Sequence, residues 1–292
     1  MENVIDTHIH LTEHRTEHGL ANEWVTEATE NLDRNWTLKD YAQATKSSEF
    51  HVQGAVFVEC SNVPPIEEAK WALRMVDDPE SIIVAVVAQI DVVRGKEAVE
   101  AAIEALKLQD GTLPKGLKGA RRVFLGPGYE SPDACLAPTF LEGLKALQEH
   151  RLLWEFCCAP TMAPNIANCC RNFPEMTFVI DHLAHNGNDG GEMETWGPAM
   201  DELGRLENVF CKMGAIEQWD VDQPEKYLDR AIAAFGFHRI MYESNWFCNE
   251  ALGFSYNRTA SLLKEACLRA GASASDIANV FEGNAKRVYS LE

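Results

Sequence analysis

Short apolar runs rich in β-branched residues alternate with longer amphipathic stretches along most of the chain. This alternation is typical of repeated strand–helix–strand units that build a parallel sheet. After the second run, successive runs start about 25 to 35 residues apart, close to the size of one such unit. Eight runs fit buried strands: 4–10, 55–58, 82–87, 117–120, 152–156, 177–180, 208–212 and 239–242. The sequence therefore predicts one (β/α)₈ TIM barrel.

The connection after the first strand is much longer than the others. About forty residues follow His10 before the second strand, and they include His14, His18, Trp24 and Trp36. Long connections after a barrel strand usually build part of the active site. We expect this segment to form a lid or a wall.

The carboxyl-terminal part carries two further amphipathic patterns, at 258–270 and 275–290, which we expect to pack on the outside of the barrel. No internal repeat, low-complexity run or Gly/Ser linker divides the chain. We therefore expect a single domain over 1–292.

The charge balance bears on partners rather than on the fold. Twenty-six Lys and Arg residues against 45 Asp and Glu residues give a formal net charge of −19. Such a surface repels nucleic acid and anionic lipid, so neither is an expected partner. A small-molecule substrate, anionic or polyhydroxylated, remains compatible with local arginines in a cleft. A homo-oligomer is also compatible with the sequence.

The nine cysteines show neither CxxC nor zinc-ribbon spacing, which favours reduced thiols in an intracellular protein. The amino-terminal residues lack a signal-peptide pattern, and no stretch approaches the roughly 18 to 20 apolar residues of a membrane span. We expect a cytoplasmic protein.

Polar residues that end the predicted strands are the candidates for chemistry, because barrel active sites lie at the carboxyl ends of strands. His8 and His10 alternate along the first strand, so both imidazoles point to the same side. Arg121 ends the fourth strand with a guanidinium that suits a carboxylate or a polarised carbonyl. His182 follows the sixth strand directly, and His185 lies three residues later.

Glu155 and Lys212 are charged residues inside apolar runs of the fifth and seventh strands. An isolated buried charge is too costly, so each must face the pocket or be paired. Contact with substrate is one interpretation, and a structural ion pair between the two is the other.

Six segments in this order resemble the amidohydrolase-related (amidohydrolase 2) family, and more narrowly its sugar-lactonase and 2-pyrone-4,6-dicarboxylate lactonase branch. They are Asp6-Thr7-His8-Ile9-His10, Gly119-Ala120-Arg121, Ile180-Asp181-His182-Leu183, Lys212-Met213-Gly214, Glu243-Ser244-Asn245-Trp246 and Gly283-Asn284-Ala285. The resemblance covers essentially the whole chain. It implies an amidohydrolase-type barrel that hydrolyses a cyclic lactone, with catalytic roles for His8, His10 and His182 and a substrate-holding role for Arg121.

The eighth strand departs from the family pattern, since Asn245 stands where the family has an aspartate that accepts the proton of the attacking water. An amide lacks that basicity, although it can orient a water. We expect Asn245 and Trp246 to line the site, and His182 or Glu155 to replace the base. The family alignment ranks Glu243 lower, although regular pleating puts Glu243 and Asn245 on one face.

His8, His10 and His182 together also form a candidate three-ligand site for Zn²⁺. Loss of the usual aspartate ligand at Asn245 favours a site without a tightly held ion. The predicted function is hydrolysis of a sugar-acid or carboxylated cyclic lactone by attack of water on the ester carbonyl, in which His8, His10 and Lys212 hold the oxyanion. The alternatives are a metal-dependent decarboxylase or hydratase, and a binder that lost its catalytic base at Asn245.

Overall fold

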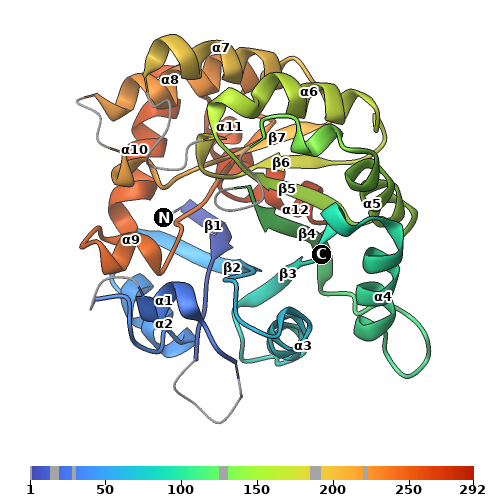
Figure 1. Cartoon of the computed structure of the whole chain (residues 1–292). Coiled ribbons are helices and arrows are strands. Elements are labelled where there is room, and N and C mark those ends of the chain that lie inside the picture. The colour runs from blue at the N-terminus through green and yellow to red at the C-terminus, as the bar shows by residue number, and fades with distance from the viewer. Residues whose placement is uncertain (1, 14–19, 28–30, 125–130, 185–191, 220–222) are drawn as a thin grey trace.

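The computed structural model describes the chain except for residues 1, 14–19, 28–30, 125–130, 185–191 and 220–222. Eight parallel strands form one sheet in the order β1 to β8, with the helices around them (Figure 1). The strands are β1 (Glu2–Ile9), β2 (Phe50–Val58), β3 (Ile83–Gln89), β4 (Leu117–Val123), β5 (Leu153–Cys157), β6 (Phe178–Ile180), β7 (Val209–Met213) and β8 (Ile240–Tyr242). Each contains or overlaps a predicted run, so the barrel prediction is confirmed.

Contacts between the first and last strands nearly close the barrel. Ile9 and Trp246 form a single parallel bridge, and the amide of His10 donates to the carbonyl of Trp246 at 2.6 Å. The hydroxyl of Thr7 donates to the carbonyl of Tyr242 at 2.7 Å. These bonds fix the end of β1, which carries both histidines, against the segment that follows β8.

Crossover helices follow most strands and pack their apolar faces on the sheet. The helices before β8 are α1 (Glu23–Glu27), α2 (Leu38–Thr45), α3 (Pro65–Val76), α4 (Lys96–Leu106), α5 (Pro138–Glu149), α6 (Ala163–Arg171), α7 (Met193–Gly204) and α8 (Pro224–Phe235). Short 3₁₀ turns lie at 92–94, 134–136, 160–162, 181–184 and 216–218. No helix in the described part of the chain has the length and apolar character needed to cross a membrane.

The carboxyl-terminal helices only partly match the prediction. After α9 (Cys248–Ala251), α10 (Tyr256–Arg269) packs against α8 on the outside, as expected. The second predicted helix is α11 (Ala274–Ala278), a π-helical turn at 279–283 and α12 (Asn284–Val288). This unit does not lie wholly outside, because Ala285 and Tyr289 join the apolar cluster inside the barrel. They plug its amino-terminal end.

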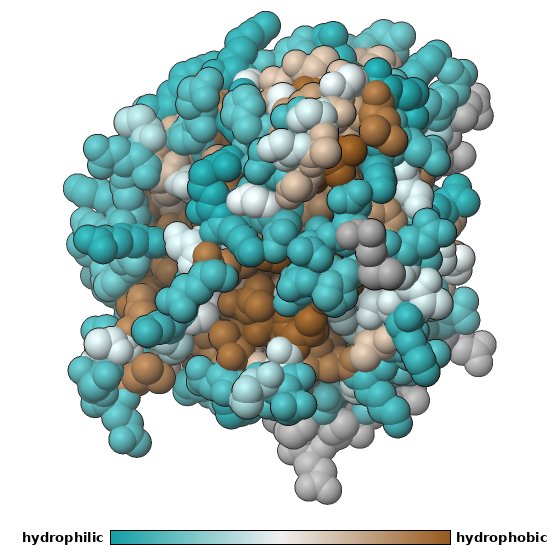
Figure 2. Space-filling view, turned by 180° about the vertical axis from the view of Figure 1, so that it is seen from behind, coloured by the Kyte–Doolittle hydropathy of each residue, from teal (hydrophilic) through white to brown (hydrophobic). Residues whose placement is uncertain are grey.

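The face seen from behind in Figure 2 is mainly hydrophilic, with one hollow in which apolar side chains gather. A cavity of about 690 Å³ lies near the beginnings of β1 and β3, where Ile5, Ile83 and Val84 line it. This is the end of the barrel opposite to the strand ends that carry the candidate catalytic residues.

Candidate active site

A cavity of about 470 Å³ lies at the carboxyl ends of the strands, where the sequence predicted the site. Four predicted residues line it: His10, Arg121, His182 and Asn245. The long first connection contributes Trp24 and Leu32 to its wall, so this segment forms part of the site. His14 and His18 lie outside the described residues. The remaining lining residues are Cys60, Ser61, Val123, Cys157, Ala215, Gln218, Trp219, Cys248 and Leu252.

The two histidines of β1 point to the same side, as their alternation predicted, and their Nε2 atoms are 3.1 Å apart. The Nδ1 atom of His10 lies 2.9 Å from the carbonyl of Val58, which can only accept, so Nδ1 carries the proton. Burial and the Lys212 ammonium lower the pKa of His8 to about 4. Burial, His8 and Arg121 lower the pKa of His10 well below its usual range. Both imidazoles are therefore neutral near pH 7.

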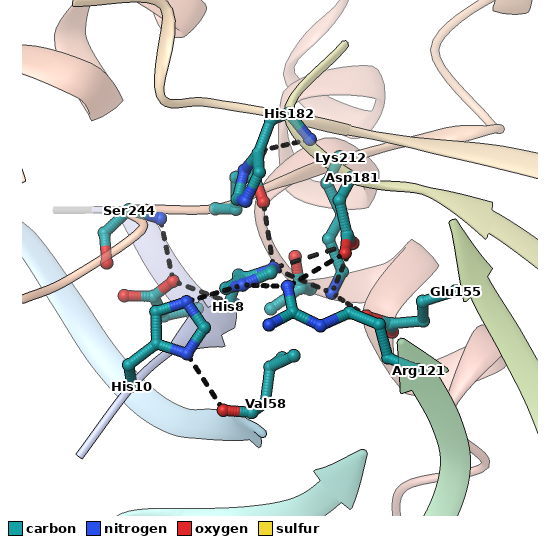
Figure 3. A network of polar contacts seen from close by, with 12 residues as sticks. His8, His10, Val58, Arg121, Glu155, Asp181, His182, Lys212 and Ser244 are labelled. Carbon is teal, nitrogen blue, oxygen red and sulfur yellow. Dashed lines mark hydrogen bonds and ion pairs between the residues drawn. The ribbon is translucent and has the colours of Figure 1, made fainter. Parts of the chain in front are cut away.

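Arg121 is held at the cavity floor by bonds to the protein itself (Figure 3). Its Nε and Nη2 donate to the carboxylate and the carbonyl of Glu59 at 2.9 and 2.7 Å. Its Nη1 lies 3.2 Å from both Asp181 Oδ2 and His8 Nε2. Burial opposes its charge, but Glu59 and Asp181 raise its pKa, so it stays a cation. Four of its five N–H groups face these partners, which leaves one for a ligand.

Lys212 and Glu155 form the buried ion pair that was one of the two interpretations of the sequence. Lys212 Nζ lies 2.5 Å from Glu155 Oε2, and neither side chain is exposed. The hydroxyl of Tyr289, on the carboxyl-terminal plug, donates to Glu155 Oε1 at 2.5 Å. Neither Glu155 nor Lys212 lines the cavity. Direct substrate binding by these two residues does not fit this placement, because neighbouring buried groups surround both side chains. Burial raises the pKa of Glu155, and the Lys212 ammonium opposes that rise.

Lys212 instead supports the residues above it. Its ammonium lies 3.2 Å from His8 Nδ1 and 3.2 Å from Asp181 Oδ1. Burial opposes the charged form, but Asp181 and Glu155 raise the pKa of Lys212. Burial likewise opposes ionisation of Asp181, yet Lys212, His8 and Arg121 hold its pKa well below the usual range. His8 is fully buried and does not line the cavity, so it too lies beneath the floor.

His182 links the cavity to a buried carboxylate. Its Nδ1 lies 2.9 Å from Glu243 Oε1, and its backbone amide donates to the same oxygen at 3.0 Å. Burial alone would raise the pKa of Glu243, but His182 and His8 lower it to about 2. Glu243 is therefore ionised, and its charge favours the Nδ1–H tautomer of His182. Nε2 of His182 has no hydrogen-bond partner within the described residues.

The inward direction of Glu243 corrects the ranking that the family alignment gave. A side chain at position 214 would collide with it, since a Cβ on Gly214 would lie 2.2 Å from the Glu243 carbonyl and 2.5 Å from its Cγ. Glycine at 214 thus makes room for Glu243 between β7 and β8. The regular alternation of side chains, which puts Glu243 and Asn245 on one face, therefore predicted the direction of Glu243 correctly.

The three remaining predicted residues have different outcomes. Asn245 lines the cavity with φ +50°, and its Oδ1 is buried without a hydrogen-bond partner in the described structure. Trp246 does not line the cavity, because its ring packs against Trp36 and Tyr41 at 5.6 and 5.3 Å. The substrate-binding prediction for Trp246 does not fit this placement. His185 lies outside the described residues.

Sequence reasoning missed Glu59 and Asp181 as members of the site. Both are buried carboxylates that directly follow β2 and β6 and bind Arg121. The available signal was an acidic residue directly after an uncharged buried strand, the same signal that pointed to His182. Arg122 differs from its neighbour, because it pairs with Asp91 at 2.6 Å and does not line the cavity.

The residues present fit a tightly held divalent ion poorly. In the described chain, the group with suitable donor spacing is His8, Asp181 and His182, rather than the predicted set with His10. Two fixed cations, Lys212 and Arg121, lie 3.2 Å from opposite ring nitrogens of His8, and each also lies 3.2 Å from Asp181. Their repulsion would oppose a second cation at these ligands.

Comparisons with known proteins agree with this architecture. The amidohydrolase family model (Amidohydro_2) matches residues 5–291, so the chain belongs to this family. An L-fucono-1,5-lactonase from Burkholderia ambifaria is 24% identical over 99% of this chain and 96% of its own length. A second L-fucono-1,5-lactonase, from Burkholderia multivorans, is 29% identical over 52% of this chain and 56% of its own length.

Solved structures share the fold at lower identity. A zinc-bound amidohydrolase from Burkholderia multivorans has a TM-score of 0.79 at 20% identity, with 99% of both chains covered. A probable 2-pyrone-4,6-dicarboxylic acid hydrolase from Acinetobacter baumannii, with citric acid bound, has a TM-score of 0.72 at 16% identity and covers 99% of this chain and 100% of its own. At these identities the likeness shows the amidohydrolase-type barrel alone.

Proposed function

We propose that this protein is a hydrolase that opens a lactone by attack of water on the ester carbonyl. The observation that carries the proposal is His182, which lines the cavity while the ionised carboxylate of Glu243 holds its Nδ1 at 2.9 Å. An imidazole oriented in this way turns its Nε2 toward the cavity. That is the arrangement of a general base supported by a buried carboxylate.

In the proposed reaction, His182 Nε2 accepts a proton from the water as its oxygen attacks the lactone carbonyl carbon. Glu243 stabilises the imidazolium that forms, as a buried negative charge next to Nδ1–H does. The tetrahedral intermediate then expels the ring oxygen. The imidazolium returns the proton to this leaving alkoxide, so the product is a hydroxy acid and His182 is regenerated.

Two groups on the cavity floor suit the developing oxyanion. Arg121 supplies a fixed positive charge and has one N–H group left for a ligand. Asn245 lines the cavity with an amide that can donate a hydrogen bond once its rotamer presents nitrogen. Donors already in place for developing charge are usually the largest contribution to acyl transfer. We assign the oxyanion to Arg121 and Asn245, while His8 and Lys212 stabilise the floor from below.

The comparisons support an ester-hydrolysing role. The relative that matches over almost the whole chain is named an L-fucono-1,5-lactonase, and one structural neighbour is named a pyrone dicarboxylic acid hydrolase. A metal-dependent decarboxylase or hydratase gains less support, because the fixed cations beside His8 oppose a tightly held ion. The alternative of a binder that lost its catalytic base at Asn245 gains no support, since Glu243 supplies a carboxylate two residues before Asn245.

We also propose that residues 1–292 act as one domain in the cytoplasm on a small-molecule substrate. All nine cysteines are free thiols, and eight of them are buried, which suits a reducing compartment. Whether copies of the chain associate is open to a direct mass measurement by light scattering.

A pH-indicator assay over a panel of lactones, linear esters and simple amides tests the function. We expect lactones to be opened at rates that rise with enzyme concentration, and the His182→Asn variant to lose at least about a hundredfold in kcat. Turnover of amides or linear esters with refusal of every lactone would overturn the proposal. Full activity of a folded His182→Asn variant would overturn the assignment of the base.

A further inference from the structure

The cavity carries information about the substrate beyond the type of bond that is broken. We infer that it binds an uncharged lactone with an apolar alkyl or aryl substituent, rather than a carboxylated or polyhydroxylated one. The inference rests on the proposed function for the lactone ring and on separate observations for the substituent. Those observations are the apolar wall, the exposed apolar side chains at the cavity and the charge beneath its floor.

The wall above the catalytic residues is mostly apolar. Among the described residues that line the cavity, nine of fifteen are apolar or cysteine, and these include Leu32, Val123 and Trp219. The polar side chains in this described lining are Ser61 and Gln218, besides the four predicted residues His10, Arg121, His182 and Asn245. The amide of Gln218 already donates to Asn249 Oδ1 at 2.7 Å. A ligand with several hydroxyl groups would bury them against carbon without partners, which is costly.

Two exposed apolar side chains also line this cavity. In the described chain, five large hydrophobic residues are exposed, and Trp24 and Leu252 of these line the cavity, at 46% and 53% exposure. Apolar groups exposed together beside a cavity typically mark a binding surface. A substituent that covers Trp24 and Leu252 would remove them from water, and its own burial would add to the affinity.

The charge at the floor disfavours an anionic substrate. Among the described residues that line the cavity, Arg121 is the one basic residue of the Lys or Arg type. Its guanidinium already binds Glu59 and Asp181. The buried carboxyl groups of Glu59, Asp181 and Glu243 near the floor already outnumber the two cations there, Arg121 and Lys212. A substrate carboxylate would therefore meet one free N–H and surplus negative charge. The inferred substrate therefore differs from the anionic or polyhydroxylated one that we expected from the sequence.

The volume is consistent with a substituted ring. A cavity of about 470 Å³ lies within the range of pockets that enclose whole small-molecule ligands. An unsubstituted six-membered lactone would touch the floor and leave the Trp24 and Leu252 side of the wall in contact with water. We expect a substituent of several carbons to reach that wall.

The test uses a matched series of six-membered lactones: unsubstituted, propyl, pentyl and phenyl, together with a carboxyalkyl lactone of the same length as the pentyl one. We expect kcat/KM to rise about fourfold for each methylene that is buried. The carboxyalkyl lactone should fall below the unsubstituted ring. A carboxyalkyl lactone or a sugar-acid lactone that is preferred over the pentyl lactone would overturn the inference.

Variants connect the preference to the wall. Trp24→Ala and Leu252→Ala should each lower the ratio of kcat/KM for the pentyl lactone to that for the unsubstituted lactone by about fivefold to tenfold. Leu268→Ala is the matched control, because Leu268 is exposed at 54% and does not line the cavity. It should leave the ratio unchanged. If Trp24→Ala and Leu252→Ala keep the same ratio as the Leu268→Ala control, the placement of the substituent against Trp24 and Leu252 is contradicted.

Calorimetric binding of the corresponding lactams separates this inference from the proposed function. If no lactone is opened but pentyl lactam binds more tightly than carboxyalkyl lactam, the hydrolase proposal fails and the inferred ligand class stands. If lactones are opened but carboxyalkyl lactam binds more tightly, the ligand class fails and the hydrolase proposal stands.

Discussion

Replacement of Glu243 by glutamine tests the catalytic arrangement most sharply among single changes to the floor. The variant keeps the shape of the side chain and an oxygen for the His182 amide, but it removes the negative charge next to Nδ1. Burial raises the pKa of this carboxyl, but His182 and His8 outweigh it and lower the pKa from 4.5 to about 2. The net shift corresponds to about 3 kcal/mol in favour of the ionised form.

If that interaction supports the imidazolium in the transition state, kcat of Glu243→Gln should fall on the order of a hundredfold or more. KM should change little, because Glu243 does not line the cavity. Steady-state kinetics on the best lactone give both values, and urea unfolding shows whether the variant remains folded.

Glu68→Gln is the matched control. Burial and Glu59 raise the pKa of Glu68 to about 8, so this buried carboxyl is largely neutral at pH 7 and an amide resembles it. Activity of the control should stay within about threefold of wild type. A folded Glu243→Gln variant with nearly wild-type kcat would refute the role assigned to the carboxylate.

Two further variants test buried charged groups, and one treatment tests for a bound metal. Lys212→Met leaves Glu155 and Asp181 without their cation and should lower the free energy of unfolding by about 3 to 5 kcal/mol, measured in urea; no loss would contradict the buried ion pair. Burial raises the pKa of Asp6 from 3.8 to about 6, so its ionised form costs stability above that pH. Asp6→Asn should therefore be up to about 3 kcal/mol more stable than wild type at pH 8, and the gain should vanish as the pH falls from about 6 to about 4. Dialysis against a chelator, followed by elemental analysis, should leave lactone turnover unchanged; a loss that Zn²⁺ restores would contradict the poor fit of a metal beside His8.

Most of the fold could be predicted from the sequence, because barrel strands are buried on both faces and therefore appear as apolar runs. The same rule located His10, Arg121 and His182, which follow or end such runs and line the cavity. It also located Glu155 and Lys212, but it could not decide between pairing and substrate contact. The answer depends on how deep in the barrel the two side chains lie, and the local sequence pattern of each strand does not contain that information.

The departures have similar physical causes. The family alignment ranked Glu243 low, and the space that admits its side chain comes from Gly214, directly after the neighbouring strand β7. Trp246 lies in a segment that resembles the family, but Trp36 from the long first connection packs against its ring and covers it. The helix unit at 274–288 lies only partly outside the barrel, since Ala285 joins the inner apolar cluster and the neighbouring Tyr289 reaches Glu155. Each outcome depends on partners distant in sequence.

Ring opening of the pentyl lactone in ¹⁸O-labelled water tests the central claim most directly. Attack of water on the carbonyl predicts one ¹⁸O atom in the product carboxylate and none in the new hydroxyl group, at a rate that falls at least about a hundredfold in His182→Asn. Label in the hydroxyl group, or no ring opening of any lactone by the folded wild-type protein, would contradict the account.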